Sequence, residues 1–123
     1  MAKFSKFEEI QAWQKAHDVT LIIYRISAVG DFSKDYGLRD QIRRAAVSIM
    51  ANIAEGHGRR TNAEFANFLN LSRGSVAEVQ SHLYVALGLG YVDQSDFDEL
   101  YQQLTEISRM TLSLAQYLRA TDR

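Results

Sequence analysis

The residues of this chain that are best suited to binding chemistry lie between positions 39 and 60. Five arginines and two acidic residues occur there, which gives this stretch a charge of +3 in a chain whose net charge is −1. The planar guanidinium group of arginine pairs with phosphate or carboxylate through two parallel hydrogen bonds. These arginines are therefore candidate contacts for an anionic partner, with nucleic acid as the first possibility: Arg39, Arg43, Arg44, Arg59 and Arg60.

The acidic residues are concentrated in a different part of the chain. Five of them, with no lysine or arginine, fall between Asp93 and Glu106 and give that stretch a charge of −5. Such polarity can steer an anionic partner to one side, or it can set complementary charges against each other where identical subunits meet. A solvated charge pattern without any partner is the third interpretation that the sequence leaves open.

No set of residues has the spacing of a catalytic or metal-binding site. Cysteine is absent, which excludes disulfides, thiolate nucleophiles and cysteine-ligated metals. The Glu-x-x-His pairs that hold metals in helical bundles do not occur, and the nearest approach, Glu78 with His82, is typical of a surface pair. We therefore expect no enzyme activity, no metal, no cofactor and no small-molecule substrate.

A further group of polar residues shares one face of the helix predicted over residues 36–56. Because Asn52 and Glu55 border the core stripe, they predict a buried hydrogen-bond network that fixes the register of this helix. A polar ligand pocket at the end of the bundle is the alternative. Gly56 and Gly58 are predicted to stop the helix, with Gly56 in the left-handed conformation. The predicted network comprises Gln41, Ser48, Asn52 and Glu55.

The elements that position these residues are four predicted helices, over about residues 6–29, 36–56, 62–88 and 96–119. Proline, which interrupts helices, is absent. Capping boxes at Ser5 and Thr61 begin the first and third helices, and Asp35 is a cap for the second. Short connections between such helices favour an all-α, antiparallel up-down-up-down four-helix bundle, formed by residues 1–123 as one domain.

The first helix carries two apolar stripes, although a helix in a small monomeric bundle usually needs only one. The second stripe indicates a contact between subunits, or else a wide core-facing surface. The second helix presents a mixed face where another chain or a polyanion can dock, with a solvated face as the alternative. The second stripe is Ile10, Trp13, His17, Leu21 and Tyr24, and the mixed face is Arg39, Arg43, Val47, Met50 and Ala54.

Residues 36–56 (YGLRDQIRRAAVSIMANIAEG) closely resemble the signature of small bacterial four-helix-bundle proteins encoded in intervening sequences of 23S rRNA genes. The resemblance implies a ring-like homo-oligomer, typically a pentamer. It also implies kinship with the accessory protein of diversity-generating retroelements, a similar pentamer whose basic surface binds nucleic acid. Met50 stands where these relatives usually carry proline, which implies a straighter second helix. The likeness covers nearly the whole chain, through Phe7, residues 13–16, Glu64-Phe65, Gly74-Ser75, Glu78 and residues 89–91.

The sequence leads to two functional hypotheses. The first is a non-enzymatic oligomeric bundle that binds RNA or DNA with low sequence specificity through the arginines of the second helix and the turn after it. The alternative is an assembly or adaptor protein whose arginines stabilise subunit interfaces and which binds no nucleic acid. The chain has no signal-peptide pattern and no stretch of about 18 uncharged apolar residues, so we expect a cytoplasmic protein without membrane contact.

Overall fold

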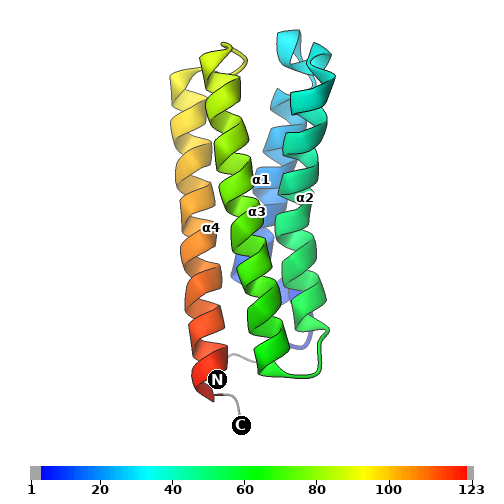
Figure 1. Ribbon diagram of the computed structural model, residues 1–123, viewed down its shortest axis with the longest axis vertical. Helices are drawn as coiled ribbons and strands as arrows, with labels where there is room; N and C mark the ends of the chain where they lie inside the picture. Colours follow the sequence, from blue (N-terminus) through cyan, green and yellow to red (C-terminus); the bar gives the residue numbers. More distant parts are fainter. Residues whose placement is uncertain (1–3, 122–123) are drawn as a thin grey trace.

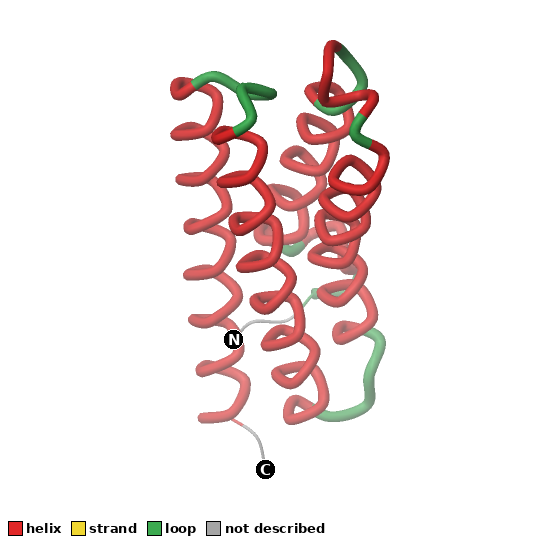
Figure 2. Tube along the Cα trace, turned by 45° about the horizontal axis from the view of Figure 1, so that its top comes forward, coloured by secondary structure: helices red, strands yellow, loops and turns green. Residues whose placement is uncertain are grey.

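The computed structural model describes residues 4–121, so the ends of the predicted domain, residues 1–3 and 122–123, lie outside the described part. Every regular element within residues 4–121 is a helix (Figure 2). Four α-helices, α1 Gln11–Ile26, α2 Tyr36–His57, α3 Asn62–Gly88 and α4 Gln94–Thr121, are accompanied by the 3₁₀ helices η1 Phe7–Glu9 and η2 Gly30–Lys34. The prediction of an all-helical bundle of four helices is confirmed.

The four helices lie side by side, and the chain connects consecutive helices at alternate ends of the bundle (Figure 1). α2 packs against α1 and α3, and α4 packs against α3 and α1. Their inward faces form one hydrophobic core along the bundle axis, which includes Ile23, Ile49, Leu69 and Leu104. None of the helices in the described part is long and apolar enough to cross a membrane.

Two of the three predicted caps are present. The Asp35 carboxylate accepts a hydrogen bond from the backbone N–H of Leu38 at 3.2 Å and begins α2. Thr61 and Glu64 form a reciprocal capping box at the start of α3. These contacts satisfy backbone donors that the first turn of a helix leaves without an intrahelical partner. The starts of both helices therefore follow from local sequence, as predicted.

The start of the first helix differs from the prediction, because Ser5 does not form a capping box with Glu8. Its backbone N–H and its hydroxyl instead donate to the Glu9 carboxylate, both at 3.0 Å, and these bonds hold the pKa of Glu9 below its usual value. The chain then turns through η1 and an extended Ile10, and α1 begins only at Gln11. The turn allows Ile10 to be buried and Phe7 to pack edge-on against Trp13.

The connection from α1 to α2 is longer than the gap between the helices predicted over residues 6–29 and 36–56. α1 ends at Ile26, and η2 follows with Phe32 only 1% exposed. The Phe32 ring stacks on Tyr91 with ring centres 5.1 Å apart, and the Tyr91 hydroxyl donates to Asp35 at 2.9 Å. This hydrogen bond raises the pKa of Tyr91. The two connections at this end of the bundle are thus packed together.

The predicted left-handed stop at Gly56 is wrong. Gly56 is a buried residue inside α2, which continues to His57, and the cap residue Gly58 has a right-handed φ of −79°. Within residues 4–121, positive φ occurs only at Gly30 and Gly90. Gly56 is required for a different reason: a Cβ atom there would lie 2.7 Å from the Cβ of Phe68 on α3. The glycine therefore permits a close approach of α2 to α3.

Candidate functional site

Arg39, in the first turns of α2, is engaged within the chain. Its Nη1 donates to the backbone oxygen of Ser33 at 3.0 Å, and its Nε donates to the Asp40 carboxylate at the same distance. The guanidinium also lies over the Tyr36 ring, 4.8 Å from its centre. The side chain is 26% exposed. Arg39 therefore helps to hold η2 against α2, and only part of its charge faces outward.

Arg43, one turn further along α2, joins this helix to the end of α1. Its Nε donates to the Ser27 hydroxyl at 2.8 Å, and its Nη2 donates to the backbone oxygen of Tyr24 at 3.2 Å. The guanidinium carbon also lies 4.6 Å from the centre of the Tyr24 ring. Guanidinium groups bind carbonyl oxygens and aromatic faces well in partly desolvated positions. Arg43 is thus a structural contact between α1 and α2.

The three other candidate arginines are more accessible. Arg59 donates to the Glu55 carboxylate at 2.7 Å and lies over the Phe68 ring at 4.6 Å, so its charge is partly neutralised. Arg44 and Arg60 are exposed, and within residues 4–121 neither guanidinium has a hydrogen bond or an ion pair. These two side chains are the ones most available to an anionic partner.

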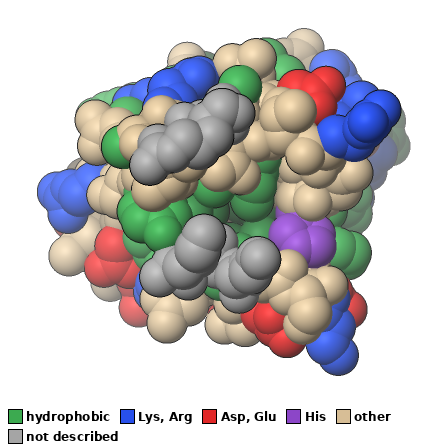
Figure 3. Space-filling view, turned by 90° about the horizontal axis from the view of Figure 1, so that it is seen from below, with side chains coloured by type: hydrophobic (Ala, Val, Ile, Leu, Met, Phe, Trp, Pro, Cys, Tyr) green, Lys and Arg blue, Asp and Glu red, His purple; other side chains and the backbone are tan. Residues whose placement is uncertain are grey.

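The five arginines do not form a single surface. α2 is 22 residues long, which corresponds to about 33 Å at 1.5 Å per residue. Arg39 lies in its first turns, whereas Arg59 and Arg60 follow its other end. Figure 3 shows that other end, with hydrophobic side chains at its centre and lysine and arginine side chains at its periphery. The arginines of one subunit therefore fall into two groups. The first half of α2 carries Arg39, Arg43 and Arg44, and the turn after α2 carries Arg59 and Arg60.

A small pocket lies beside Arg59 and Arg60, at one end of the bundle, where the alternative prediction placed a polar ligand site. Its volume is about 180 Å³, below the roughly 300 Å³ at which small-molecule sites usually begin. The Nε2 of His57, in its wall, is 2.8 Å from the backbone oxygen of Phe4. The pocket is lined by Phe4, His57, Arg59, Arg60, Thr61, Asn62, Phe65, Tyr117, Leu118 and Thr121.

The predicted polar network exists in part. The Asn52 amide donates to the backbone oxygen and the hydroxyl of Ser48, at 2.9 and 3.1 Å, and the Ser75 hydroxyl of α3 donates to the same Ser48 hydroxyl at 3.0 Å. Gln41 and Glu55 do not belong to it, because both are exposed and Glu55 pairs with Arg59. The network joins α2 to α3 through Ser75, which the sequence prediction did not include.

The second apolar stripe of the first helix, without the buried Ile10, and the apolar part of the mixed face of α2 meet in one surface. Trp13 stacks on His17 with ring centres 5.3 Å apart. Leu21, Tyr24 and Val47 remain 40%, 42% and 40% exposed. A shallow hollow of about 220 Å³ between α1 and α2 is lined by apolar residues alone, namely Phe7, Trp13, Val47, Met50, Ala51 and Ala54. We call this surface, made of the hollow residues with His17, Leu21 and Tyr24, the α1/α2 face.

Two further charged contacts involve α1, α3 and α4. Lys15 of α1 forms an ion pair with Glu106 of α4 at 2.8 Å, which lowers the pKa of Glu106. The Nε2 of His82 lies 3.6 Å from the Glu78 carboxylate one turn earlier on α3, but the His82 side chain is only 17% exposed, so the two do not form the surface pair that the sequence predicted. No group of three or more histidine, aspartate or glutamate side chains that could hold a metal ion occurs in the described part of the chain.

The comparisons with known proteins point to one family. The family model of the 23S rRNA-intervening sequence proteins matches residues 8–113. A solved structure of a protein of unknown function from the S23 ribosomal protein family of Bacteroides thetaiotaomicron has a TM-score of 0.77 and 23% sequence identity. The similarity covers 85% of this chain and 98% of that chain. No curated protein matches this chain. At this identity the solved structure supports the fold alone.

Proposed function

This chain belongs to the 23S rRNA-intervening sequence protein family, and we propose that it acts as a non-enzymatic, antiparallel helical bundle that assembles with copies of itself in the cytoplasm. The assembly is a ring-like homo-oligomer, and the resemblance of residues 36–56 to this family favours a pentamer. In this proposal the arginines are less important than the sequence predicted. Because Arg39 and Arg43 bond within their own chain, self-assembly has stronger support than a single arginine surface for nucleic acid.

The observation that carries the proposal is the α1/α2 face. Aromatic and aliphatic side chains are gathered there on the outer surface of a small bundle, and the hollow between them has no polar side chain in its lining. Scattered apolar residues are normal on protein surfaces, but contiguous apolar patches mark interaction sites. Burial of this face in a subunit contact removes its apolar area from water, and that is the main driving force of association.

The mass of the protein in solution tests this proposal. We expect a single species of about five times the 14.0 kDa chain mass by light scattering after size-exclusion chromatography. The species should persist at high salt, because the contact is mainly apolar rather than ionic. A mass of one chain at micromolar to tens-of-micromolar concentration, with an intact helical spectrum, contradicts the proposal.

Nucleic-acid binding is the second candidate function, and the exposed arginines at the α2–α3 turn favour it. Arg60 has no partner within residues 4–121, and Arg59 shares its charge only with Glu55. A ring repeats this turn once per subunit, so cations that are few in one chain become numerous in the assembly. Repeated arginines of this kind bind phosphates without reading the sequence.

We expect the oligomer to retard structured RNA at about 50 mM salt, with an affinity that falls steeply as salt rises, by a log–log slope of roughly −0.9 for each phosphate contacted in a duplex. The double variant Arg59→Glu with Arg60→Glu should abolish the shift while the oligomer stays intact. Arg25→Glu with Arg109→Glu changes the net charge equally at other exposed positions and serves as the control. An equal loss in both variants, or no shift for the native protein, rules out the turn as the binding site.

A further inference from the structure

A second exposed apolar surface lies on α3. Leu71, Val85 and Leu89 are 57%, 47% and 57% exposed. Together with Glu78 and His82 they follow one another at steps of seven, four, three and four residues, which places the first four on one side of α3 and Leu89, the residue that caps the helix, in line with them. We call these five residues the α3 ridge. None of these five residues belongs to the buried core stripe of α3, and all of them except His82, whose side chain is 17% exposed, are exposed to solvent.

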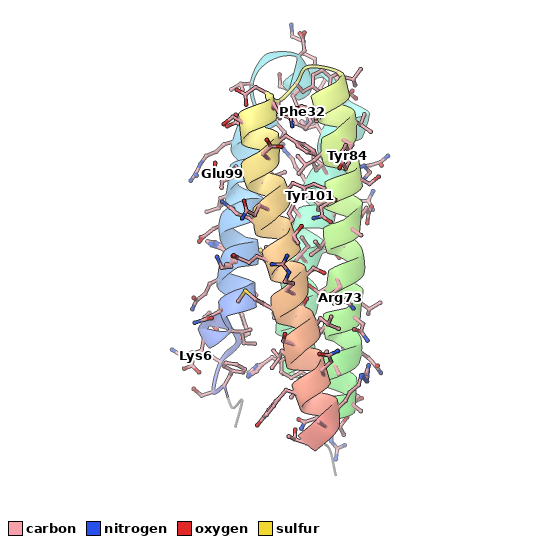
Figure 4. The ribbon with its side chains drawn as sticks, turned by 90° about the vertical axis from the view of Figure 1, so that its left-hand side faces the viewer. Lys6, Phe32, Arg73, Tyr84, Glu99 and Tyr101 are labelled. Atoms are coloured by element: carbon pink, nitrogen blue, oxygen red, sulfur yellow. The ribbon has the colours of Figure 1, made fainter. Side chains whose placement is uncertain are left out.

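Tyr84 is exposed on α3 as well, but it belongs to a different contact. Its ring centre lies 4.9 Å from that of Phe97 and 5.6 Å from that of Tyr101, both on α4. Figure 4 shows Tyr84 and Tyr101 next to each other between the two helices. A hydrogen bond with Tyr101 raises the pKa of Tyr84. Tyr84 therefore packs against its own α4, whereas Leu71, Glu78, Val85 and Leu89 of the α3 ridge are exposed to solvent.

The α1/α2 face and the α3 ridge lie on different sides of the molecule. α3 packs against α2 and α4, and Figure 1 shows it in front of the bundle with α1 behind. We propose that the α3 ridge of one copy packs into the α1/α2 face of the next. This inference rests on the proposed self-assembly and names the two surfaces that form each contact. A contact between two α1/α2 faces would leave the α3 ridge exposed to water, whereas the head-to-tail contact covers both.

The charges of the two surfaces support the same pairing. Glu78 lies in the middle of the α3 ridge with its side chain 49% exposed. The α1/α2 face is bordered by Arg43 over Tyr24 and by the unpaired Arg44, one turn before Val47 on the outer side of α2. A contact between two α1/α2 faces sets arginines near arginines, and a contact between two ridges sets Glu78 near Glu78. The head-to-tail contact instead brings carboxylate to guanidinium.

A head-to-tail contact has a consequence for the assembly. Each copy uses two different surfaces, so each copy needs two neighbours, and the chain of contacts closes into a ring or continues as a filament. The proposal thereby accounts for a ring from the surfaces of one subunit. A symmetric contact between identical faces would end at a dimer.

Complementation between two variants tests this pairing. Val47→Glu damages only the α1/α2 face, and Val85→Glu damages only the α3 ridge; both native side chains are partly exposed, so both variants should fold. We expect each change to weaken self-association at least about tenfold, because each places an unpaired carboxylate in an apolar contact. An equimolar mixture of the two should form a one-to-one dimer, since one undamaged pair of surfaces remains.

Gln102→Glu, at an exposed position of α4, is the control and should keep the native mass. Leu71→Glu is a second ridge variant in case Val85→Glu lowers the helical signal. If the native protein forms oligomers but both ridge variants keep the native mass, or if the mixture stays monomeric, the pairing is wrong while self-assembly stands. If the native protein is itself monomeric, the proposed function fails first.

Discussion

Gly56→Ala is expected to lower the free energy of unfolding by about 2 kcal/mol, although alanine is the better helix former by about 1 kcal/mol. The added Cβ would lie 2.7 Å from the Cβ of Phe68, 3.0 Å from the Phe65 ring and 3.2 Å from the backbone oxygen of Phe65. None of these atoms is the far end of a flexible side chain. The two helices must therefore separate, which also strains the contacts around the Ser48 and Ser75 hydroxyls.

Gly74→Ala is the matched control, because Gly74 lies in the interior of α3 and a Cβ there has no atom within 4 Å. This substitution should raise stability by up to about 1 kcal/mol through helix propensity alone. Thermal melts of the two variants at one protein concentration measure the difference, since assembly makes the melting temperature concentration-dependent. A Gly56→Ala protein as stable as Gly74→Ala contradicts the close approach of α2 and α3.

The helices were predictable where local sequence decides the structure. α2 and α3 begin where Asp35 and Thr61 provide caps, and α3 occupies residues 62–88 as predicted. The start of the first helix was not predictable, because the Ser-x-x-Glu pattern at Ser5 contains no information about the packing of Ile10 and Phe7. Ile10 is buried in the core, and Phe7 lines a hollow together with residues of α2. The Gly56 prediction failed for the same reason. A glycine near a helix end usually has a positive φ, and only the partner helix reveals a steric requirement.

The candidate surfaces were predictable to a similar extent. Helical spacing assigned most of the α1/α2 face, because periodicity determines which residues share a side of a helix, but it wrongly included Ile10, which is buried, and it omitted Phe7 and Ala51. It did not show that Arg43 bonds to Tyr24, nineteen residues earlier, since that contact depends on the turn between two helices. The α3 ridge was missed because its three apolar residues are separated by Glu78 and His82, and the continuous core stripe of α3 dominates the pattern.

Phe32→Ala is expected to lower the free energy of unfolding by about 3–4 kcal/mol, although the sequence around it reads as a polar turn. The side chain is 1% exposed and stacks on Tyr91, whose hydroxyl holds the Asp35 cap of α2. Its removal leaves a cavity between the two connections at this end of the bundle. The loss therefore combines the transfer free energy of a phenyl group with weaker support for the start of α2.

Val29→Ala is the control for Phe32→Ala, because Val29 precedes η2 in the same connection and is 65% exposed. It should change stability by less than about 0.5 kcal/mol. Tyr91→Phe separates the two parts of the Phe32 effect, since it keeps the ring and removes the hydrogen bond to Asp35, at a cost of about 1 kcal/mol. Urea unfolding with a common slope measures all three variants. If Phe32→Ala unfolds at the same urea concentration as Val29→Ala, the Phe32 side chain does not contribute to the core.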